Sequence, residues 1–183
     1  MDNIAIREYA ETYKDEIIEL ILNIQQNEFG ISIRKEDQPD LADIKNFYQT
    51  GSGNFWVALC QDKVVGTISL KDIGNQRGAL RKMFVKSEYR GIQFKTAQYL
   101  LDSLLVWTHI HALTDIYLGT TEKFLAAHRF YEKNNFECIS SDKLPPNFPI
   151  MKVDTRFYHL KLPFNLTSAA GQLAEVVSLH SLL

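Results

Sequence analysis

The stretch VKSEYRGIQFKTAQYLL, residues 85 to 101, decides the fold because its composition changes halfway along, from that of a turn to that of a helix. Its first half is basic and contains Gly91, and its second half has the apolar spacing of an amphipathic helix. The first N–H groups of a helix lack intrahelical partners, and the helix dipole is positive there. A junction of this kind stabilises an anion, above all a phosphate. The stretch therefore predicts a strand, a turn and a helix that bind a diphosphate.

Positive charge gathers around this junction. Between residues 77 and 95, six basic residues stand against Glu88 alone, which is the sharpest charge asymmetry in the chain. Arg90 can bind phosphate oxygens with its forked guanidinium, Gly91 lets the backbone approach a ligand, and Thr96 offers a hydroxyl. A solvated basic strand face is the simpler interpretation of such a cluster taken alone. The spacing matches neither a Walker loop nor the GxGxxG motif of dinucleotide-binding proteins.

Outward from the junction, apolar periodicity predicts strands and long helices in alternation. Asp40 is well placed to cap a short helix, and a hairpin follows it. Helices that cross between the strands of a mixed sheet give an α/β (α+β) fold. The expected helices cover residues 13–24, 41–49, the second half of the quoted stretch and 121–134, and the expected strands cover residues 4–9, 54–60, 64–70, 79–85, 115–120, 136–140 and 155–162.

A second segment, LGTTEKFLAAHRFYEKNNFE at residues 118–137, joins the Arg-Gly turn in a family pattern. Together they resemble the GCN5-related N-acetyltransferases (GNAT), whose members read LxT followed by AxxxYxxxGF. Ala127, Tyr131 and Phe136 fall in register, and Asn135 replaces the usual glycine. Asparagine is the next best residue for a left-handed helix end. The resemblance implies a GNAT-like mixed, mostly antiparallel sheet of about six or seven strands, flanked by about four helices, over residues 1–162.

The resemblance also implies acetyl-coenzyme A (acetyl-CoA) as co-substrate and no metal. Tyr131 becomes the candidate general acid, because a neutral phenol of pKa ~10 can protonate a departing thiolate. Taken as a lone residue, Tyr131 is more readily interpreted as an aromatic on a buried helix face, and the family register reverses this preference. The strand at residues 79–85 is expected to bulge and to offer backbone N–H groups near its end. The expected cofactor-binding residues are Met83, Phe84, Val85, Arg90, Gly91, Ile92, Gln93, Phe94, Lys95, Thr96 and Ala127.

Two of these residues depart from the family signature. Gln93 and Lys95 stand where family members prefer small residues, and Lys95 either adds a charge for the cofactor or crowds it. Phe124 stands where many members carry asparagine.

The acceptor pocket is expected around the first two helices, with Glu28, Phe29 and Asp37 as substrate-binding residues. Their acids could attract a cationic amine, although a solvated surface residue is an equal interpretation. The general base stays unassigned, because the strand at residues 79–85 has no carboxylate. Water leading to Glu28, Asp37 or Asp40 is one option, and His128 is another.

Composition limits the classes of partner. The chain has 183 residues and a formal net charge of -2, which argues against a general nucleic-acid binder. No signal peptide or membrane span is predicted, so a cytoplasmic location without membrane contact is expected. Cys60 and Cys138 lie in apolar strand contexts and are predicted to be buried free thiols, which suits a reducing compartment. The apolar tail at residues 163–183 could form a helix, pair two copies as a homodimer, or be a remnant of cloning.

Two functions from different classes follow. The first is an N-acetyltransferase that moves an acetyl group from acetyl-CoA to a primary amine of a small molecule or peptide, by direct attack in a ternary complex. The second is a non-catalytic module that binds coenzyme A (CoA) or a protein. An acyltransferase with a longer donor is a third option.

Overall fold

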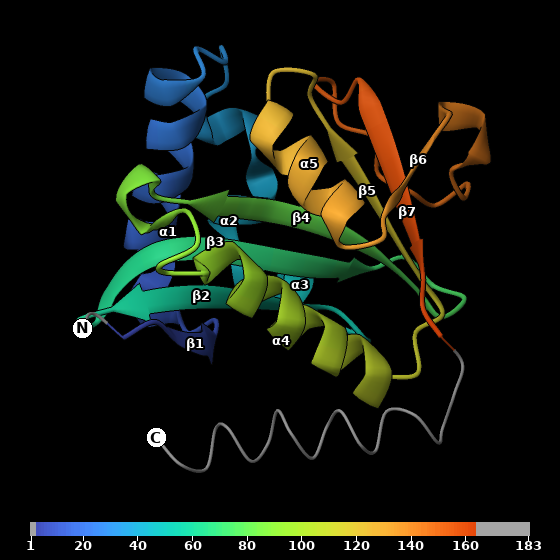
Figure 1. Cartoon of the computed structure of the whole chain (residues 1–183), viewed down its shortest axis with the longest axis horizontal. Coiled ribbons are helices and arrows are strands. Elements are labelled where there is room, and N and C mark those ends of the chain that lie inside the picture. Colours follow the sequence, from blue (N-terminus) through green and yellow to red (C-terminus); the bar gives the residue numbers. More distant parts are fainter. Residues whose placement is uncertain (1–2, 164–183) are drawn as a thin grey trace.

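The computed structural model describes residues 3–163, which form one seven-stranded sheet (Figure 1). The strand order is β1-β2-β3-β4-β5-β7-β6. Every neighbouring pair is antiparallel except β4 and β5, which are parallel. The strands are β1 (Ala5–Glu8), β2 (Asn54–Cys60), β3 (Lys63–Asp72), β4 (Arg77–Val85), β5 (Asp115–Thr120), β6 (Glu137–Ile139) and β7 (Arg156–Lys161).

Five α-helices flank the sheet in the described residues. They are α1 (Lys14–Asn23), α2 (Pro39–Ala42), α3 (Ile44–Tyr48), α4 (Thr96–Ile110) and α5 (Leu125–Lys133). The π-helical turn η2 (Ile24–Glu28) extends α1. The predicted mixed, mostly antiparallel sheet is confirmed. The structure has one helix more than expected because the segment predicted as a single helix at residues 41–49 is divided.

Asp43 causes this division. Its side chain accepts a hydrogen bond from Asn46 N and caps α3, so the chain ends one helix and starts the next at this residue. The prediction that Asp40 caps the helix was wrong, because Asp40 lies inside α2 and is buried. A buried carboxylate needs partners, and those of Asp40 belong to the site described below.

Both faces of the sheet are covered, which explains why β2 is an unbroken apolar run. Trp56 and Ala58 point to one face, where they join a core cluster with α4 and α5 residues. Phe55 and Val57 point to the other face and pack with α1 and α3 residues. This alternation is the two-residue period of a strand. Figure 1 shows α4 and α5 together in front of the sheet and α2 and α3 behind it.

A third apolar cluster holds the long segment between η5 (Ser141–Lys143) and β7 on the sheet. Phe148 from this segment is buried against Phe157 of β7, with 6.3 Å between their ring centroids. The same segment brings Met151 next to Arg81 of β4 and Asp154 next to Gly119 of β5.

The cysteine prediction is half correct. Cys60 is a buried free thiol, as expected. The prediction for Cys138 was wrong, because it lies exposed on β6, which is an edge strand of the sheet. Among residues 3–163, no helix has the length and apolarity needed to cross a membrane. The predicted tail at residues 163–183 lies, beyond Pro163, outside the described residues.

Candidate active site

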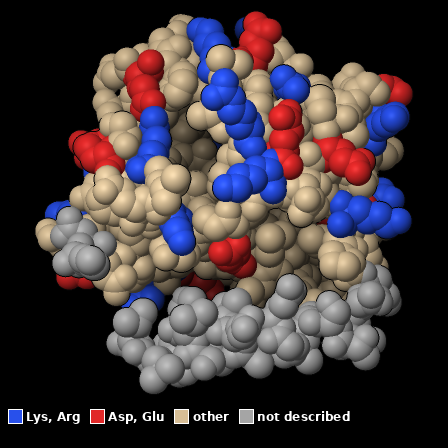
Figure 2. All heavy atoms as spheres, viewed as in Figure 1, with Lys and Arg blue, Asp and Glu red and all other residues tan. Residues whose placement is uncertain are grey.

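A cavity of about 480 Å³ lies where β4 and β5 separate. The two strands pair only from Arg77 to Ala79 on β4 and from Asp115 to Tyr117 on β5. Beyond this point each strand continues without a ladder to the other, so the sheet has a wedge-shaped gap. Figure 2 shows a hollow in the face that carries α5, with basic side chains gathered beside it. The fold therefore supplies an opening between two parallel strand ends.

A bulge in β4 borders the cavity. The register steps from Ser69↔Arg81 to Thr67↔Phe84, so two β4 residues oppose one β3 residue. Lys82 lies in this bulge with φ 51°, an uncommon value for a residue with a side chain. Three predicted cofactor-binding residues, Met83, Phe84 and Val85, line the cavity next to the bulge. Since β4 has no β5 partner here, its backbone groups on that edge face the gap, where N–H groups can stabilise an oxyanion.

Tyr131 reaches the same cavity from α5. Its ring is 5% exposed and packs against Phe136 and Tyr158. Its hydroxyl makes no hydrogen bond to any other residue in the described range 3–163. Burial raises the pKa of the Tyr131 phenol well above its ordinary value, so the hydroxyl keeps its proton. Tyr131 is thus both a core aromatic and a protonated donor beside the β4 bulge.

The turn before α4 has the backbone of an anion site. Gly91 has φ 92°, and a Cβ there would meet nothing within 4 Å, so the turn is open to solvent. Lys95 precedes α4 in a left-handed conformation and provides no side-chain cap. Consequently the first N–H groups of α4 have no side-chain cap from this residue.

The side chains of this turn are arranged differently from the expectation. Thr96 is buried, and its hydroxyl donates to Tyr89 O at 2.8 Å instead of facing a ligand. Ile92, Gln93 and Lys95 are exposed, and neither they nor Phe94 line the cavity. Any anion bound here is therefore held mainly by backbone groups and Arg90.

Arg90 is already paired. Its guanidinium donates to both carboxylate oxygens of Glu28, with 2.8 Å between Nη2 and Oε2, and its Nε donates to Val85 O at 2.7 Å. Glu28 ends the π-helical turn η2, so this pair joins the first-helix region to the turn before α4. Glu28 was predicted to bind the acceptor, and the structure places it on Arg90 instead, outside the cavity lining.

Aromatic rings narrow the cavity between the side expected to bind the cofactor and the side expected to bind the acceptor. Phe29, a predicted acceptor residue, lines the cavity and makes an edge contact with Phe124, 4.6 Å between centroids. Phe124 also meets Phe84 of β4 at 6.2 Å. Ala127 lines the same wall one turn before Tyr131. These rings bring apolar surface to the place where a thioester chain would pass.

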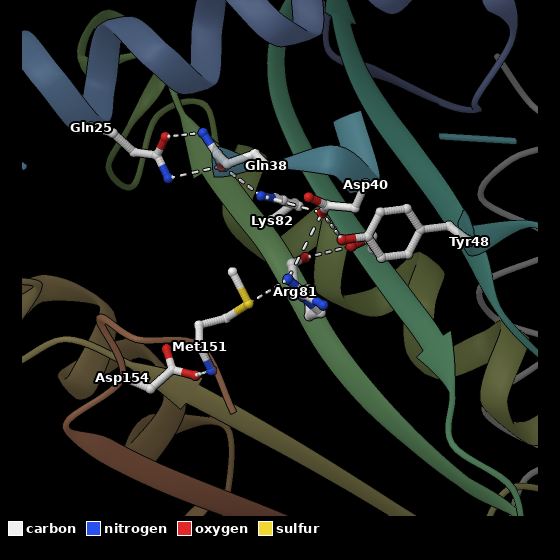
Figure 3. Close-up of polar contacts among 9 residues, drawn as sticks. Gln25, Gln38, Asp40, Tyr48, Arg81, Lys82, Met151 and Asp154 are labelled. Carbon is white, nitrogen blue, oxygen red and sulfur yellow. Dashed lines mark hydrogen bonds and ion pairs between the residues drawn. The ribbon is translucent and has the colours of Figure 1, made fainter. Parts of the chain in front are cut away.

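An ionic cluster of Asp40, Arg81 and Lys82 lies at the β4 bulge (Figure 3). The buried carboxylate of Asp40 accepts a 2.5 Å hydrogen bond from the Tyr48 hydroxyl. The same oxygen lies 3.3 Å from Lys82 Nζ and 3.9 Å from Arg81 Nη2. Lys82 also donates to Gln38 Oε1 at 2.6 Å. Burial lowers the pKa of the Lys82 ammonium to about 8, although Asp40 acts in the opposite direction.

Arg81 is the least satisfied member of this cluster. Its side chain is 11% exposed and lines the cavity. Its single hydrogen bond within residues 3–163 runs from Nη2 to the Met151 sulfur at 2.9 Å, and a thioether is a weak acceptor. A guanidinium has five N–H donors, so most of them are left for a ligand. Figure 3 shows Arg81 between Asp40 and Met151.

The remaining candidates for a general base lie elsewhere. Asp37 is on the surface, where it accepts from Arg34 N at 2.9 Å, and this bond lowers the pKa of its carboxyl. His128 is buried outside the cavity lining, with Nε2 3.0 Å from Thr121 O. Asp40 is occupied by the cluster. No group of three or more His, Cys, Asp or Glu side chains in the described part of the chain could hold a metal.

Sequence reasoning missed the residues on the acceptor side. Arg81 and Lys82 were counted in the basic cluster and given to the phosphate site, yet both line the cavity beyond the bulge. Met151 and Asp154 come from the proline-broken segment and line it as well. The available signal was the pair of adjacent cations, Arg81 and Lys82, in the apolar strand at residues 79–85. Buried charges need partners, so this pair indicated anionic groups nearby.

Known proteins resemble this chain in sequence and in fold. A family model described as "Acetyltransferase (GNAT) domain" matches residues 51–138. A crystal structure of an acetyltransferase of the GNAT family from Staphylococcus aureus Mu50 superposes with a TM-score of 0.84. It is 43% identical, and the match covers 87% of this chain and 99% of that one.

Two further comparisons bear on ligands. The chain is 36% identical over 104 residues to N-acetylaspartate synthetase of Xenopus tropicalis, which is 55% of this chain and 37% of that relative. The chain thus spans well under half of that protein. The PaiA N-acetyltransferase from Thermoplasma acidophilum, solved in complex with coenzyme A, has a TM-score of 0.67 at 17% identity. That match covers 87% of this chain and 99% of the other and shows a shared fold.

Proposed function

Because the chain belongs to the GNAT family of acetyltransferases, we propose that it transfers the acetyl group of acetyl-CoA to the primary amine of a small acidic acceptor. Family membership confirms the predicted enzyme class, an acetyl-CoA dependent N-acetyltransferase. The acidic acceptor goes beyond that class. L-aspartate is the first candidate, by analogy with the relative named above.

The under-satisfied guanidinium of Arg81 carries the choice of an acidic acceptor. The Arg81 guanidinium lines a cavity, and within residues 3–163 its hydrogen-bond partner is a thioether alone, so it favours a carboxylate ligand. Lys82 and Lys123 line the same cavity and add positive potential. Glu28 and Asp37, which would favour a cationic polyamine, both lie outside the lining.

The donor would bind on the opposite side of the bulge. The free N–H groups at the start of α4 and the Arg90 guanidinium would hold its diphosphate. The thioester would then lie along the unpaired edge of β4, with its carbonyl oxygen within reach of backbone N–H groups near Phe84 and Val85. Tyr131 would face the thioester sulfur from α5.

Direct attack fits this arrangement. The acceptor nitrogen attacks the thioester carbon, the carbonyl oxygen becomes an oxyanion, and the β4 backbone stabilises the developing charge. The C–S bond then breaks, and Tyr131 protonates the departing thiolate. Both substrates bind in one cavity, where the bulge orients them, so the bimolecular step becomes effectively unimolecular.

The acceptor panel tests the proposal directly. Thiol release from acetyl-CoA is measured with L-aspartate, L-glutamate, L-alaninamide, spermidine and a lysine peptide, after a thermal shift has shown CoA binding. We expect kcat/KM for the acidic amino acids to exceed that for spermidine at least tenfold, roughly one charge-assisted hydrogen bond. A preference for spermidine would overturn the acidic acceptor. CoA binding with no turnover of any amine would favour the non-catalytic module.

Replacing Glu28 by glutamine should tighten CoA binding. The variant frees Arg90 from its ion pair, so a phosphate no longer competes with the carboxylate. We expect the Kd for CoA to fall about twofold to fivefold, since partly exposed ion pairs contribute ~0.2–1 kcal/mol. Calorimetric titration measures the effect, and Glu88→Gln in the same turn is the matched control. Weaker binding by Glu28→Gln would show that the pair holds the turn in its binding shape.

A further inference from the structure

We propose that Asp154, in the segment between η5 and β7, is the proton acceptor for the acceptor amine. This inference rests on the proposed function and assigns the general base that the sequence left open. Asp154 lines the same cavity as Tyr131, Arg81 and the β4 bulge. It lies close enough to Arg81 and Lys82 to interact with both charges, on the side of the cavity where the acceptor would bind.

The Asp154 carboxylate is held in a fixed place by its own loop. Its Oδ2 accepts from Met151 N at 2.9 Å, and Asp154 N donates to Met151 O at 2.9 Å. The next residue, Thr155, donates to Thr120 O of β5 at 2.9 Å. One carboxylate oxygen thus closes the loop, and Oδ1 has no hydrogen-bond partner among residues 3–163. Figure 3 shows the Asp154 carboxylate against the backbone nitrogen of Met151, whose sulfur reaches Arg81 of β4.

Gly119 makes room for this carboxylate. A Cβ at Gly119 would stand 2.4 Å from Asp154 Oδ2 and 2.6 Å from Cγ, closer than any real contact. Gly119 lies in the part of β5 that no longer pairs with β4, and it lines the cavity. The missing side chain lets the carboxylate lie directly over β5 at the edge of the gap.

The charges around Asp154 favour the transfer of a proton from a bound ammonium to its carboxylate. Burial raises the pKa of its carboxyl and has the largest effect, while the hydrogen bond from Met151 N and the charges of Arg81 and Lys82 on β4 lower it. Lys123, after β5, lines the same cavity. A raised pKa makes this carboxylate a stronger base than an exposed aspartate, and the nearby cations favour loss of a proton from a bound ammonium.

The proton balance is complete with these residues and water. An ammonium acceptor first releases one proton to water through Asp154. The resulting amine attacks the thioester carbon, and its nitrogen, which is strongly acidic once the C–N bond forms, gives a second proton to water. The C–S bond breaks, and the thiolate takes a proton from Tyr131. Tyr131 regains a proton from water, so each turnover releases one proton.

The test compares Asp154→Asn with the native enzyme on two acceptors. The first is L-aspartate, or the panel amine that turns over fastest. The second is its aminooxy counterpart, whose less basic nitrogen is already deprotonated at neutral pH. Asparagine can still accept from Met151 N, so the loop is kept. We expect kcat with the amine to fall about 10²-fold, and kcat with the aminooxy compound to change less than threefold.

The pH profile gives a second readout. In the native enzyme, kcat/KM falls as the pH drops through the raised pKa of Asp154, because a protonated carboxyl cannot accept a proton. Asp154→Asn should lose this acidic limb. Asp142→Asn, an exposed acid in the preceding turn η5, is the matched control and should keep both rate and profile.

Gly119→Ala tests the position of the carboxylate without removing it. Its new methyl group displaces Asp154, so kcat with the amine should fall at least tenfold while the aminooxy rate stays within threefold. Equal losses on both acceptors, in either variant, would overturn the assignment. An unchanged amine rate in Asp154→Asn would do so too. Absence of turnover by the native enzyme on every amine would instead defeat the proposed function.

Discussion

Replacing Asp40 by alanine is expected to lower the free energy of unfolding by about 3–5 kcal/mol. The variant leaves the buried Lys82 and the largely buried Arg81 without their carboxylate, and Tyr48 loses the acceptor of its 2.5 Å hydrogen bond. A buried charge that loses its partner keeps its full desolvation cost. Urea unfolding followed by circular dichroism measures the loss. Few surface changes approach this size.

Two matched variants make the Asp40 result specific. Asp43→Ala removes a neighbouring carboxylate that caps α3 at the surface, and it should cost only about 1 kcal/mol. Lys82→Met in the Asp40→Ala background removes one orphaned cation, so it should recover part of the lost stability. If Asp40→Ala were no more costly than Asp43→Ala, the cluster would not be the ionic core described here.

Replacing Tyr131 by phenylalanine is expected to lower kcat about 10²-fold to 10⁴-fold, the usual contribution of a general acid. The ring stays and continues to pack against Phe136 and Tyr158, so folding should be retained. The thiolate then leaves without a proton donor. Because burial raises the pKa of Tyr131, the native enzyme should show no alkaline loss from this residue at pH 7–9.

Steady-state kinetics separate this role from packing. The KM for acetyl-CoA should change little in Tyr131→Phe, because the hydroxyl acts when the C–S bond breaks. Tyr158→Phe is the control, since that hydroxyl donates to Glu132 and the residue does not line the cavity. A Tyr131→Phe variant with kcat within twofold of native would return Tyr131 to the status of a core aromatic.

The fold could be predicted because its determinants are local. The turn at Arg90 and Gly91, the helix that carries Tyr131, and the apolar run of β2 each express a short-range pattern. The boundary between α2 and α3 was missed because Asp40 and Asp43 both precede apolar residues, and only packing decides which one is buried. Cys138 was misplaced because a short strand does not reveal that it lies at a sheet edge.

The site was harder to predict because its contacts join distant residues. Arg90 and Glu28 are 62 positions apart, and Arg81 and Met151 are 70 apart. The sequence assigned Arg90 to an anion and Glu28 to an amine, and each residue alone supports that assignment. Asp154 was hidden in a segment without periodicity, where tertiary hydrogen bonds alone fix its direction.

The pairing of Arg90 with Glu28 also affects how the protein responds to ionic strength. A phosphate that binds Arg90 displaces a carboxylate, so the guanidinium is neutralised both before and after the event. Because Arg90 is paired with an anion before and after the exchange, its contribution to the binding free energy depends little on screening by salt. CoA titrations at two salt concentrations should therefore show a shallower salt dependence for the native protein than for Glu28→Gln, in which Arg90 begins as a bare cation.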